Sequence, residues 1–201
     1  MTTNVRLRVG VYGGAFDPPH NTHRALAQAA LRQLALDRLH IVPTGHAWHK
    51  TQQLSAASHR LAMARLAFAD LPNTLVDARE TQREGPTYTI DTLTALQRDY
   101  PHAQLYLVIG GDQARALASW HAIDAVRKAA IICVAQRPDA DESQAQAERI
   151  FPDLTLLQMP ASPLSATEIR GLAAARRDVS HLVPAPVARY IEHHHLYRTD
   201  R

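Results

Sequence analysis

Residues 13–23, which read GGAFDPPHNTH, combine residue types that suit the binding of a phosphate group. Gly13 and Gly14 lack side chains, so their backbone can approach a phosphate closely and point N–H groups at it. His20 and His23 stand three residues apart where a helix is expected to begin, and helix N-termini favour anions. Their imidazoles can donate hydrogen bonds to phosphate oxygens and gain charge as negative charge builds up. The stretch therefore predicts a phosphate-binding loop.

The residues alone leave other interpretations of this stretch open. The glycines also fit a tight turn that binds nothing, and the histidines fit a metal pair that lacks a third ligand or two unrelated surface residues. The spacing matches neither the GxGxxG fingerprint nor the GxxxxGK[ST] loop. Asp17-Pro18-Pro19 predicts a rigid connection, after which Asn21 is expected to cap a helix that begins near Thr22.

The composition of the chain is that of a globular protein. Of its 201 residues, 46% are hydrophobic and 20% are charged, as in ordinary soluble domains. No apolar run approaches the roughly 20 residues that a membrane-spanning helix needs, and the N-terminal residues lack the pattern of a signal peptide. We therefore expect a cytoplasmic protein with no membrane partner.

Charge and cysteine content narrow the class of ligand. The formal net charge is +3, but the basic residues are scattered and aromatic residues make up only 5% of the chain. Nucleic-acid-binding proteins usually cluster both, so small phosphorylated ligands fit better than a nucleic acid. The lone cysteine, Cys133, lies in the apolar run AAIICVA, which predicts a packed thiol rather than a nucleophile.

Strand-like runs alternate with helical patterns along the whole chain. The apolar, β-branched runs predict strands at residues 6–13, 38–45, 74–80, 104–111, 131–138 and 154–160. The helical patterns predict helices at residues 21–36, 58–70, 88–100, 123–130, 165–177 and 184–197. The first of these helices places Leu26, Ala30 and Leu34 on one face. Ser165 and Glu168 have the spacing of a capping box.

This alternation implies parallel strands joined by crossovers, and hence an α/β fold. We expect a Rossmann-like open parallel sheet with helices on both faces, which binds its ligand at the carboxyl ends of the strands. The short, charged strand at residues 74–80 is expected at an edge of the sheet. We expect a single domain over residues 1–201, in which the last helices, from about residue 163 to 201, form a C-terminal helical part.

The opening stretch resembles GG[ST]FDPxHxGH, a signature of the nucleotidylyltransferase superfamily whose histidines contact nucleotide phosphates. LSATEIR, at residues 164–170, is similar to the second signature of that superfamily, ISxTxIR. The segments PTYTIDTL, IGGDQ, SWH, QRP and the closing LVPAPVARYIEHHHLYR resemble those of bacterial nicotinate-nucleotide adenylyltransferases. The resemblance covers nearly the whole chain. It implies an enzyme of NAD biosynthesis that joins nicotinate mononucleotide to the AMP part of ATP and releases pyrophosphate.

The resemblance also implies which residues form the site. Catalytic residues would be His20, His23 and Arg170. ATP-binding residues would be Gly13, Gly14, Ala15, Phe16, His20, His23, His49, Lys50, Gly110, Asp112, Ser165, Thr167 and Arg170. Residues for nicotinate mononucleotide would be Tyr88 and Thr89, through their backbone amides, Trp120, by stacking on the pyridine ring, and His121 and Arg137. Mg²⁺ is the implied cofactor, held by phosphate oxygens rather than by the protein.

Two positions depart from the family pattern, and several alternative functions stay open. Ala15 replaces a serine or threonine, and Thr22 replaces a glycine between the histidines, so a β-branched side chain could crowd the nucleotide there. Sister adenylyltransferases acting on nicotinamide mononucleotide or phosphopantetheine use the same triphosphate site. A nucleotide-binding module without turnover is an alternative from another class, and the missing GxGxxG argues against a dehydrogenase.

Some conspicuous residues have plainer interpretations. We expect the tract His193-His194-His195 to be a solvated helix face rather than a metal site. Asp112 fits a helix cap as well as a ribose contact. We interpret the charged residues of the loop after the third strand as exposed and without a task; they are Arg79, Glu80, Arg83 and Glu84.

Overall fold

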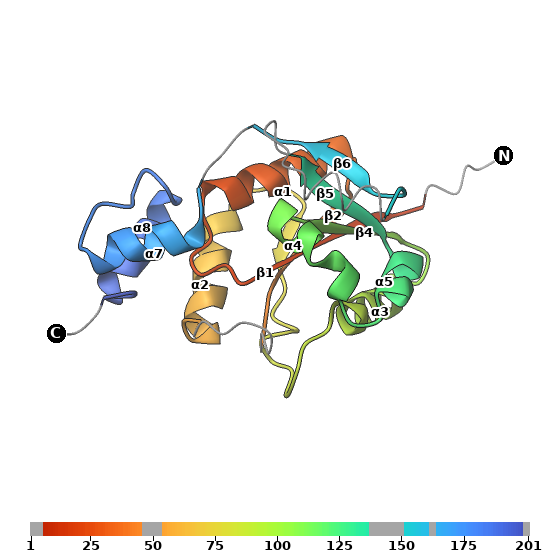
Figure 1. Cartoon of the computed structure of the whole chain (residues 1–201), viewed down its shortest axis with the longest axis horizontal. Coiled ribbons are helices and arrows are strands. Elements are labelled where there is room, and N and C mark those ends of the chain that lie inside the picture. Colours follow the sequence, from red (N-terminus) through yellow and green to blue (C-terminus); the bar gives the residue numbers. More distant parts are fainter. Residues whose placement is uncertain (1–5, 46–53, 137–150, 161–163, 199–201) are drawn as a thin grey trace.

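The computed structural model describes residues 6–45, 54–136, 151–160 and 164–198, and within them six strands form one parallel sheet (Figure 1). The strands are β1 (Arg8–Gly14), β2 (Arg38–Pro43), β3 (Thr74–Val76), β4 (Gln104–Ile109), β5 (Ile131–Gln136) and β6 (Thr155–Gln158). Their order is β3-β2-β1-β4-β5-β6, and every neighbouring pair is parallel. The expected Rossmann-like sheet is confirmed, and β3 lies at its edge as predicted.

Helices cover both faces of the sheet, because the strands are apolar on both sides. On β4, Leu105 and Leu107 belong to one buried cluster, whereas Tyr106 and Val108 belong to the other. The cluster with Tyr106 is covered by α1 (Asn21–Gln33) and α2 (Ala57–Phe68). The opposite cluster is covered by α3 (Thr89–Asp99), α4 (Gly111–Arg115), a 3₁₀ turn (Leu117–Ser119) and α5 (Ile123–Ala129).

The C-terminal helices α7 (Ala166–Ala174) and α8 (Ala185–His193) lie beside α2, beyond the end of the sheet (Figure 1). Ile169 of α7 and Val187 of α8 are fully buried in the same apolar cluster as α1 and α2. The apolar cluster of α1 and α2 therefore continues into the C-terminal helices. The single domain over residues 1–201 stays a prediction. Among the residues described, none of the helices combines the length and apolarity needed to cross a bilayer.

Local sequence explains most element positions and some of the differences. Leu26, Ala30 and Leu34 are all buried, as the helical periodicity predicts. Three predicted helices end three or four residues earlier than expected, α1 at residue 33 rather than 36, α7 at 174 rather than 177 and α8 at 193 rather than 197. Arg176 and His195 have left-handed φ angles of 56° and 50°, a conformation that ends a helix.

The topology brings several loops together at the carboxyl ends of the strands, which we call the ligand edge of the sheet. In the register of β1 and β2, Gly14 stands opposite Pro43, and the Thr44 amide donates to the Gly14 carbonyl at 2.8 Å. On the other side of β1, Tyr12 stands opposite Val108 of β4. The chain leaves β1 toward α1 on one face and leaves β4 toward α4 on the other. The strand order therefore reverses between β1 and β4, which is where open parallel sheets bind ligands.

Candidate active site

Asp17, in the loop between β1 and α1, is a centre of hydrogen bonding. Its side chain is only 2% exposed. One carboxylate oxygen accepts from the Ser55 amide at 2.9 Å and the other from the Tyr197 hydroxyl at 2.7 Å. Its backbone carbonyl accepts from Nη1 of Arg170 at 2.8 Å, and its peptide bond to Pro18 is cis. Three segments that are remote in the sequence thus converge on this loop.

The second signature meets the first through Arg170. Besides its bond to Asp17, the guanidinium donates through Nη2 to the Thr167 hydroxyl at 3.1 Å. Ser165 is the N-cap of α7, where its hydroxyl accepts from the Glu168 amide at 3.2 Å, so the predicted Ser165 cap is confirmed. The structure thus brings together the two segments that resemble the two superfamily signatures.

The two signature histidines are stacked at the start of α1. Their ring centroids lie 3.7 Å apart with an interplanar angle of 29°. The His20 amide donates to Nδ1 of His23 at 3.1 Å. Because that Nδ1 accepts a hydrogen bond, the neutral His23 ring carries its proton on Nε2. This arrangement fixes both the tautomer and the orientation of His23.

The His20 imidazole is neutral at pH 7. Its side chain is 5% exposed, and this burial lowers its pKa from 6.5 to about 4. Its Nδ1 is buried and has no hydrogen-bond partner among the described residues. A buried polar atom of this kind is costly unless something binds it. The charge that the sequence suggested for this imidazole would therefore have to come from a bound anion that raises its pKa.

The structure places other predicted ATP-binding residues at the ligand edge of the sheet. Gly13 and Gly14 end β1, and Ala15 and Phe16 follow directly. The Phe16 ring is 1% exposed and packs edge-on against Phe68 at 5.7 Å. Phe16 can therefore offer a ligand only its backbone.

The capping prediction for Asn21 is wrong, and Asp112 does not stand at a cap position either. His20, not Asn21, is the N-cap of α1, and the Asn21 side-chain amide donates to the His181 carbonyl at 3.1 Å in the loop before α8. Asp112 lies inside α4, whose N-cap is Gly110. Asn21 is occupied by a tertiary contact that local sequence does not reveal.

Arg60 is a structural centre of the site that the sequence interpretation missed. The side chain is 2% exposed and donates to four backbone carbonyls. Their residues are Ala15 (3.0 Å), Thr44 (2.7 Å), Gly45 (3.3 Å) and Ser55 (3.0 Å). Burial lowers the pKa of the guanidinium, and the Asp17 carboxylate opposes that shift. A signal was present in the sequence, because Arg60 stands in register with the buried residues of α2 that follow it.

On the opposite face, the residues predicted for nicotinate mononucleotide gather near the N-terminus of α3. Tyr88 is the N-cap of α3 and Thr89 its first residue. The Tyr88 ring lies 4.2 Å from the His121 ring, with an interplanar angle of 32°. Trp120 is half-buried against the apolar cluster on this face. Trp120 directly precedes His121 in the sequence, so the three residues lie near one another. We call them the aromatic surface.

Arg79 and Glu80 make specific contacts within the protein. The sequence interpretation of these two residues as exposed loop charges is therefore wrong. The Glu80 side chain accepts from the Thr92 hydroxyl at 2.7 Å, and Arg79 bridges Asp77 and Asp99. The Asp77 pKa is lowered to about 2: burial opposes ionisation, but hydrogen bonds from His40 and Arg79 outweigh it. These bonds attach the loop after β3 to α3.

The loop after β3 also approaches the loop after β2 closely. A Cβ added to Gly45 would lie 2.0 Å from the Glu80 carbonyl oxygen, so only glycine fits there. This contact and the hydrogen bond from Thr92 hold Glu80 between Gly45 and α3.

The histidine tract is solvent-exposed, as predicted. α8 ends at His193, and His194 and His195 follow it on the surface. The described residues contain no group of three His, Cys, Asp or Glu side chains that could hold a metal ion. His194 packs its ring against Tyr190 at 4.2 Å.

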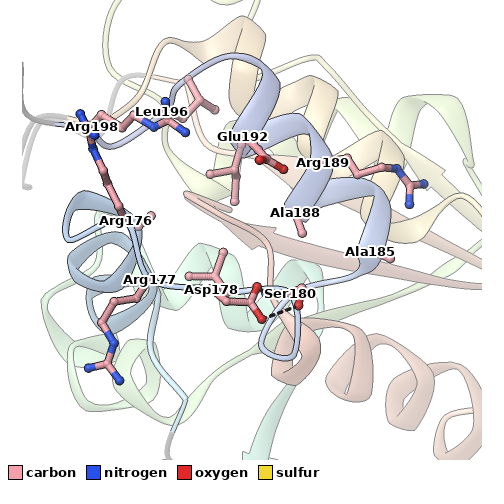
Figure 2. Close-up of a pocket in the computed structure, with 13 residues that line it drawn as sticks. Arg176, Arg177, Asp178, Ser180, Ala185, Ala188, Arg189, Glu192, Leu196 and Arg198 are labelled. Carbon is pink, nitrogen blue, oxygen red and sulfur yellow. Dashed lines mark hydrogen bonds between the residues drawn. The ribbon is translucent and has the colours of Figure 1, made fainter.

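A surface hollow of about 590 Å³ lies between the end of α7, the loop that follows it, and α8 (Figure 2). None of the predicted site residues lines it. The guanidinium groups of Arg177 and Arg189 lie on different sides of the hollow and do not point toward one another (Figure 2). The hollow is therefore separate from the candidate active site.

Four predicted site residues lie wholly or partly outside the described part of the structure. His49, Lys50 and Arg137 belong to the ranges that are not described, and only the backbone of Asp112 is described. Their predicted roles stay predictions.

Comparison with known proteins bears on this geometry. A family model described as cytidylyltransferase-like matches residues 11–172. A curated relative from Albidiferax ferrireducens, named "probable nicotinate-nucleotide adenylyltransferase", is 52% identical over 96% of this chain and 98% of its own length. The chain belongs to the nicotinate-nucleotide adenylyltransferase family.

Further members of the nicotinate-nucleotide adenylyltransferase family agree in sequence and in fold. A relative of the same name from Pseudomonas aeruginosa is 39% identical over 95% of this chain and 97% of its own. The solved nicotinic acid mononucleotide adenylyltransferase of Plasmodium falciparum, complexed with APC, has a TM-score of 0.78. It is 19% identical and covers 96% of this chain and 98% of its own. At that identity the likeness shows a shared fold.

The burial of His20 predicts a pH-dependent contribution to the stability of this family member. Between pH 6.5 and 4 the unfolded chain binds a proton that the folded chain excludes, so the free energy of unfolding falls as the pH falls through this window. One pKa unit is worth about 1.36 kcal/mol, which gives a loss of about 3 kcal/mol from His20. In urea unfolding at pH 7, 6, 5 and 4, His20→Gln should lose less stability than the wild type. Parallel curves for the two proteins would contradict this account of His20.

Arg60 predicts a second, larger effect on stability. Arg60→Leu removes the donor from four carbonyls and leaves the buried Asp17 without its opposing charge, so we expect a loss of about 3–5 kcal/mol. The matched control is Arg65→Leu on the exposed side of the same helix, with an expected change within about 0.5 kcal/mol. Urea unfolding at pH 7 measures both, and equal losses would refute the assigned role.

Proposed function

We propose that the protein transfers the adenylyl group of ATP to nicotinate mononucleotide, giving nicotinate adenine dinucleotide and pyrophosphate. One observation carries the proposal: Arg170 of the second signature bonds the Asp17 carbonyl at 2.8 Å, beside the stacked His20 and His23. The names of relatives up to 52% identical support it. Since ATP is the co-substrate, we place the reaction in the cytoplasm.

The triphosphate of ATP would lie along the edge formed by the two signatures. Gly13 and Gly14 would present backbone N–H groups, and His20 and His23 would donate to phosphate oxygens. Arg170 would add a fixed cation, because its hydrogen bonds to the Asp17 carbonyl and the Thr167 hydroxyl hold the guanidinium plane. The hydroxyls of Ser165 and Thr167 lie on the first turn of the same helix, where the dipole favours an anion. His49, Lys50, Gly110 and Asp112 complete the proposed ATP-binding set.

Nicotinate mononucleotide would bind at the aromatic surface. Trp120 would offer a face for the pyridine ring, and the tilted Tyr88 and His121 rings would lie beside it. The backbone amides at the start of α3, from Tyr88 and Thr89, would receive the nicotinate carboxylate. Arg137 would contribute on the phosphate side of the nucleotide.

The chemistry needs positioning more than proton transfer. The 5′-phosphate of the mononucleotide has a second pKa near 6, so it is largely dianionic at neutral pH and attacks without a general base. One of its oxygens bonds to the α-phosphorus of ATP as the bond from that phosphorus to the pyrophosphate oxygen breaks. The fixed donors His20, His23 and Arg170 would hold the reactants in line and offset the charge growing on pyrophosphate.

The donors at the site suit phosphate oxygens rather than Mg²⁺, which prefers oxygen ligands. They are imidazoles and a guanidinium, and both carboxylate oxygens of Asp17 already accept hydrogen bonds. We therefore propose that Mg²⁺ is held by the phosphate oxygens of ATP, where it supplies charge neutralisation.

A paired-substrate assay tests the proposed reaction. The protein is incubated with ATP and either nicotinate or nicotinamide mononucleotide, with Mg²⁺ or with excess chelator, and pyrophosphate release is followed. We expect release with nicotinate mononucleotide and Mg²⁺, a slower rate with the amide, and loss of activity with chelator. A faster rate with nicotinamide mononucleotide would overturn the substrate assignment, and no release with either acceptor would overturn the reaction.

Substitution of the paired histidines tests their proposed role. His20→Ala and His23→Ala should each lower kcat by about 10²–10³-fold, because each removes a fixed donor to developing charge. The matched control, His102→Ala, alters an exposed histidine that precedes β4. It therefore lies at the amino ends of the strands, away from the candidate site. Its kcat should stay within twofold of the wild type. Near-normal turnover in both site variants would exclude the histidines from catalysis.

A further inference from the structure

The chain beyond α8 turns back and reaches the loop after β1. The Leu196 amide bonds the Ile191 carbonyl at 3.0 Å, which closes the end of the helix. His195 and Tyr197 then take left-handed φ angles of 50° and 67°. Such angles are uncommon for residues other than glycine, and they persist only where surrounding contacts enforce them. The turn directs the Tyr197 side chain toward the body of the protein.

The contact that Tyr197 makes is with the buried carboxylate of Asp17. Its hydroxyl donates to Oδ1 at 2.7 Å and lies 3.9 Å from the sulfur of Met63. Burial and the neighbouring carboxylate raise the pKa of Tyr197. The hydroxyl therefore stays protonated at neutral pH and remains the donor of this hydrogen bond.

The contact matters because each oxygen of the Asp17 carboxylate accepts a hydrogen bond from a single group among the described residues, Oδ2 from the Ser55 amide and Oδ1 from Tyr197. At 2% exposure, the carboxylate cannot rely on water. Without the Tyr197 hydroxyl, Oδ1 would have to move to find a donor, and the backbone leading to His20 would move with it.

We propose that Tyr197 is a positioning residue for adenylyl transfer, which holds the Asp17 carboxylate and thereby fixes the loop that presents His20 to the phosphates. This inference rests on the proposed function for its kinetic readout. It assigns a task in the site to the C-terminal segment, which lies beyond the end of the family match at residue 172.

A second tyrosine of the same region provides a matched control. Tyr190 of α8 shares a hydrogen bond of 3.0 Å with Nδ1 of His59 on α2. Both tyrosine hydroxyls thus join the C-terminal part to the α2 region, but only Tyr197 contacts the loop after β1. A comparison of the two phenylalanine variants separates positioning of the loop from general attachment of the C-terminal part.

Kinetics and histidine spectra measured on Tyr197→Phe and Tyr190→Phe test the inference. In Tyr197→Phe we expect kcat to fall about 10- to 100-fold, as for displaced catalytic groups, with KM for nicotinate mononucleotide within twofold of the wild type. The imidazole ¹H–¹⁵N signals of His20 and His23 should shift. In Tyr190→Phe we expect an unchanged kcat and a shift confined to His59 and its neighbours.

A double-mutant cycle shows whether Tyr197 acts through Asp17. If it does, Tyr197→Phe combined with Asp17→Ala should be no slower than the slower single variant, because either change removes the hydrogen bond between the hydroxyl and Oδ1. If Tyr197→Phe does not fold, Asp17→Ala, which keeps Tyr197, carries the kinetic and spectral comparison, and wild-type kcat and histidine signals in that variant would overturn the inference.

Two results would overturn the inference. One is a Tyr197→Phe protein whose kcat and His20 and His23 signals match the wild type, and the other is an equal loss of kcat in Tyr190→Phe. Failure of the proposed reaction is distinguishable from both, because the wild type would then turn over no acceptor. The histidine spectra would still decide the role of Tyr197.

Discussion

The burial of one carboxylate is the constraint on which the candidate site depends. An ionised side chain that water cannot reach must find fixed donors or an opposing charge within the protein. Asp17 meets this need with a backbone amide before α2, a hydroxyl from the C-terminal segment and the nearby charge of Arg60. The loop between β1 and α1 is thereby held to elements that follow it by tens to well over a hundred residues.

Arg60 is a buried positive charge, which needs acceptors just as the buried carboxylate needs donors. Its guanidinium donates to carbonyls of the loops that follow β1 and β2, groups that neither strands nor helices satisfy. Asp17 and Arg60 therefore form the buried polar centre of a site that is otherwise built from loops. In such a centre, the rigidity that phosphate transfer needs comes from hydrogen bonds rather than from regular secondary structure.

Local patterns predicted the elements well, because they depend on neighbours in sequence. Alternating apolar runs gave the parallel strands, and the periodicity of Leu26, Ala30 and Leu34 gave the buried face of α1. The prediction that residues 13–23 bind phosphate followed from residue types and spacing, and it stays a prediction. Pairing with the segment around Arg170 came from the resemblance, because no physical rule connects positions so far apart.

What the sequence did not reveal depends on tertiary contacts. Asn21 has the chemistry of a cap, but the His181 carbonyl takes its side chain and His20 occupies the cap position. Glu80 looks like a solvated loop charge, yet the fold buries it against Thr92. Tyr197 depends on a left-handed backbone angle that no local pattern predicts. Arg60 differs from these, because a charged residue in the apolar register of α2 was visible beforehand.

The departure at Ala15 becomes understandable from the same bonds. A serine or threonine at this position would offer a hydroxyl to a phosphate, and alanine does not. The carbonyl of Ala15, however, accepts from Arg60 at 3.0 Å, so the conformation of the loop does not depend on the missing hydroxyl. The backbone N–H groups that would face the phosphates keep their positions for the same reason. Loss of one side-chain donor is then a local change in affinity, whereas loss of Arg60 or Asp17 would alter the geometry of the whole loop.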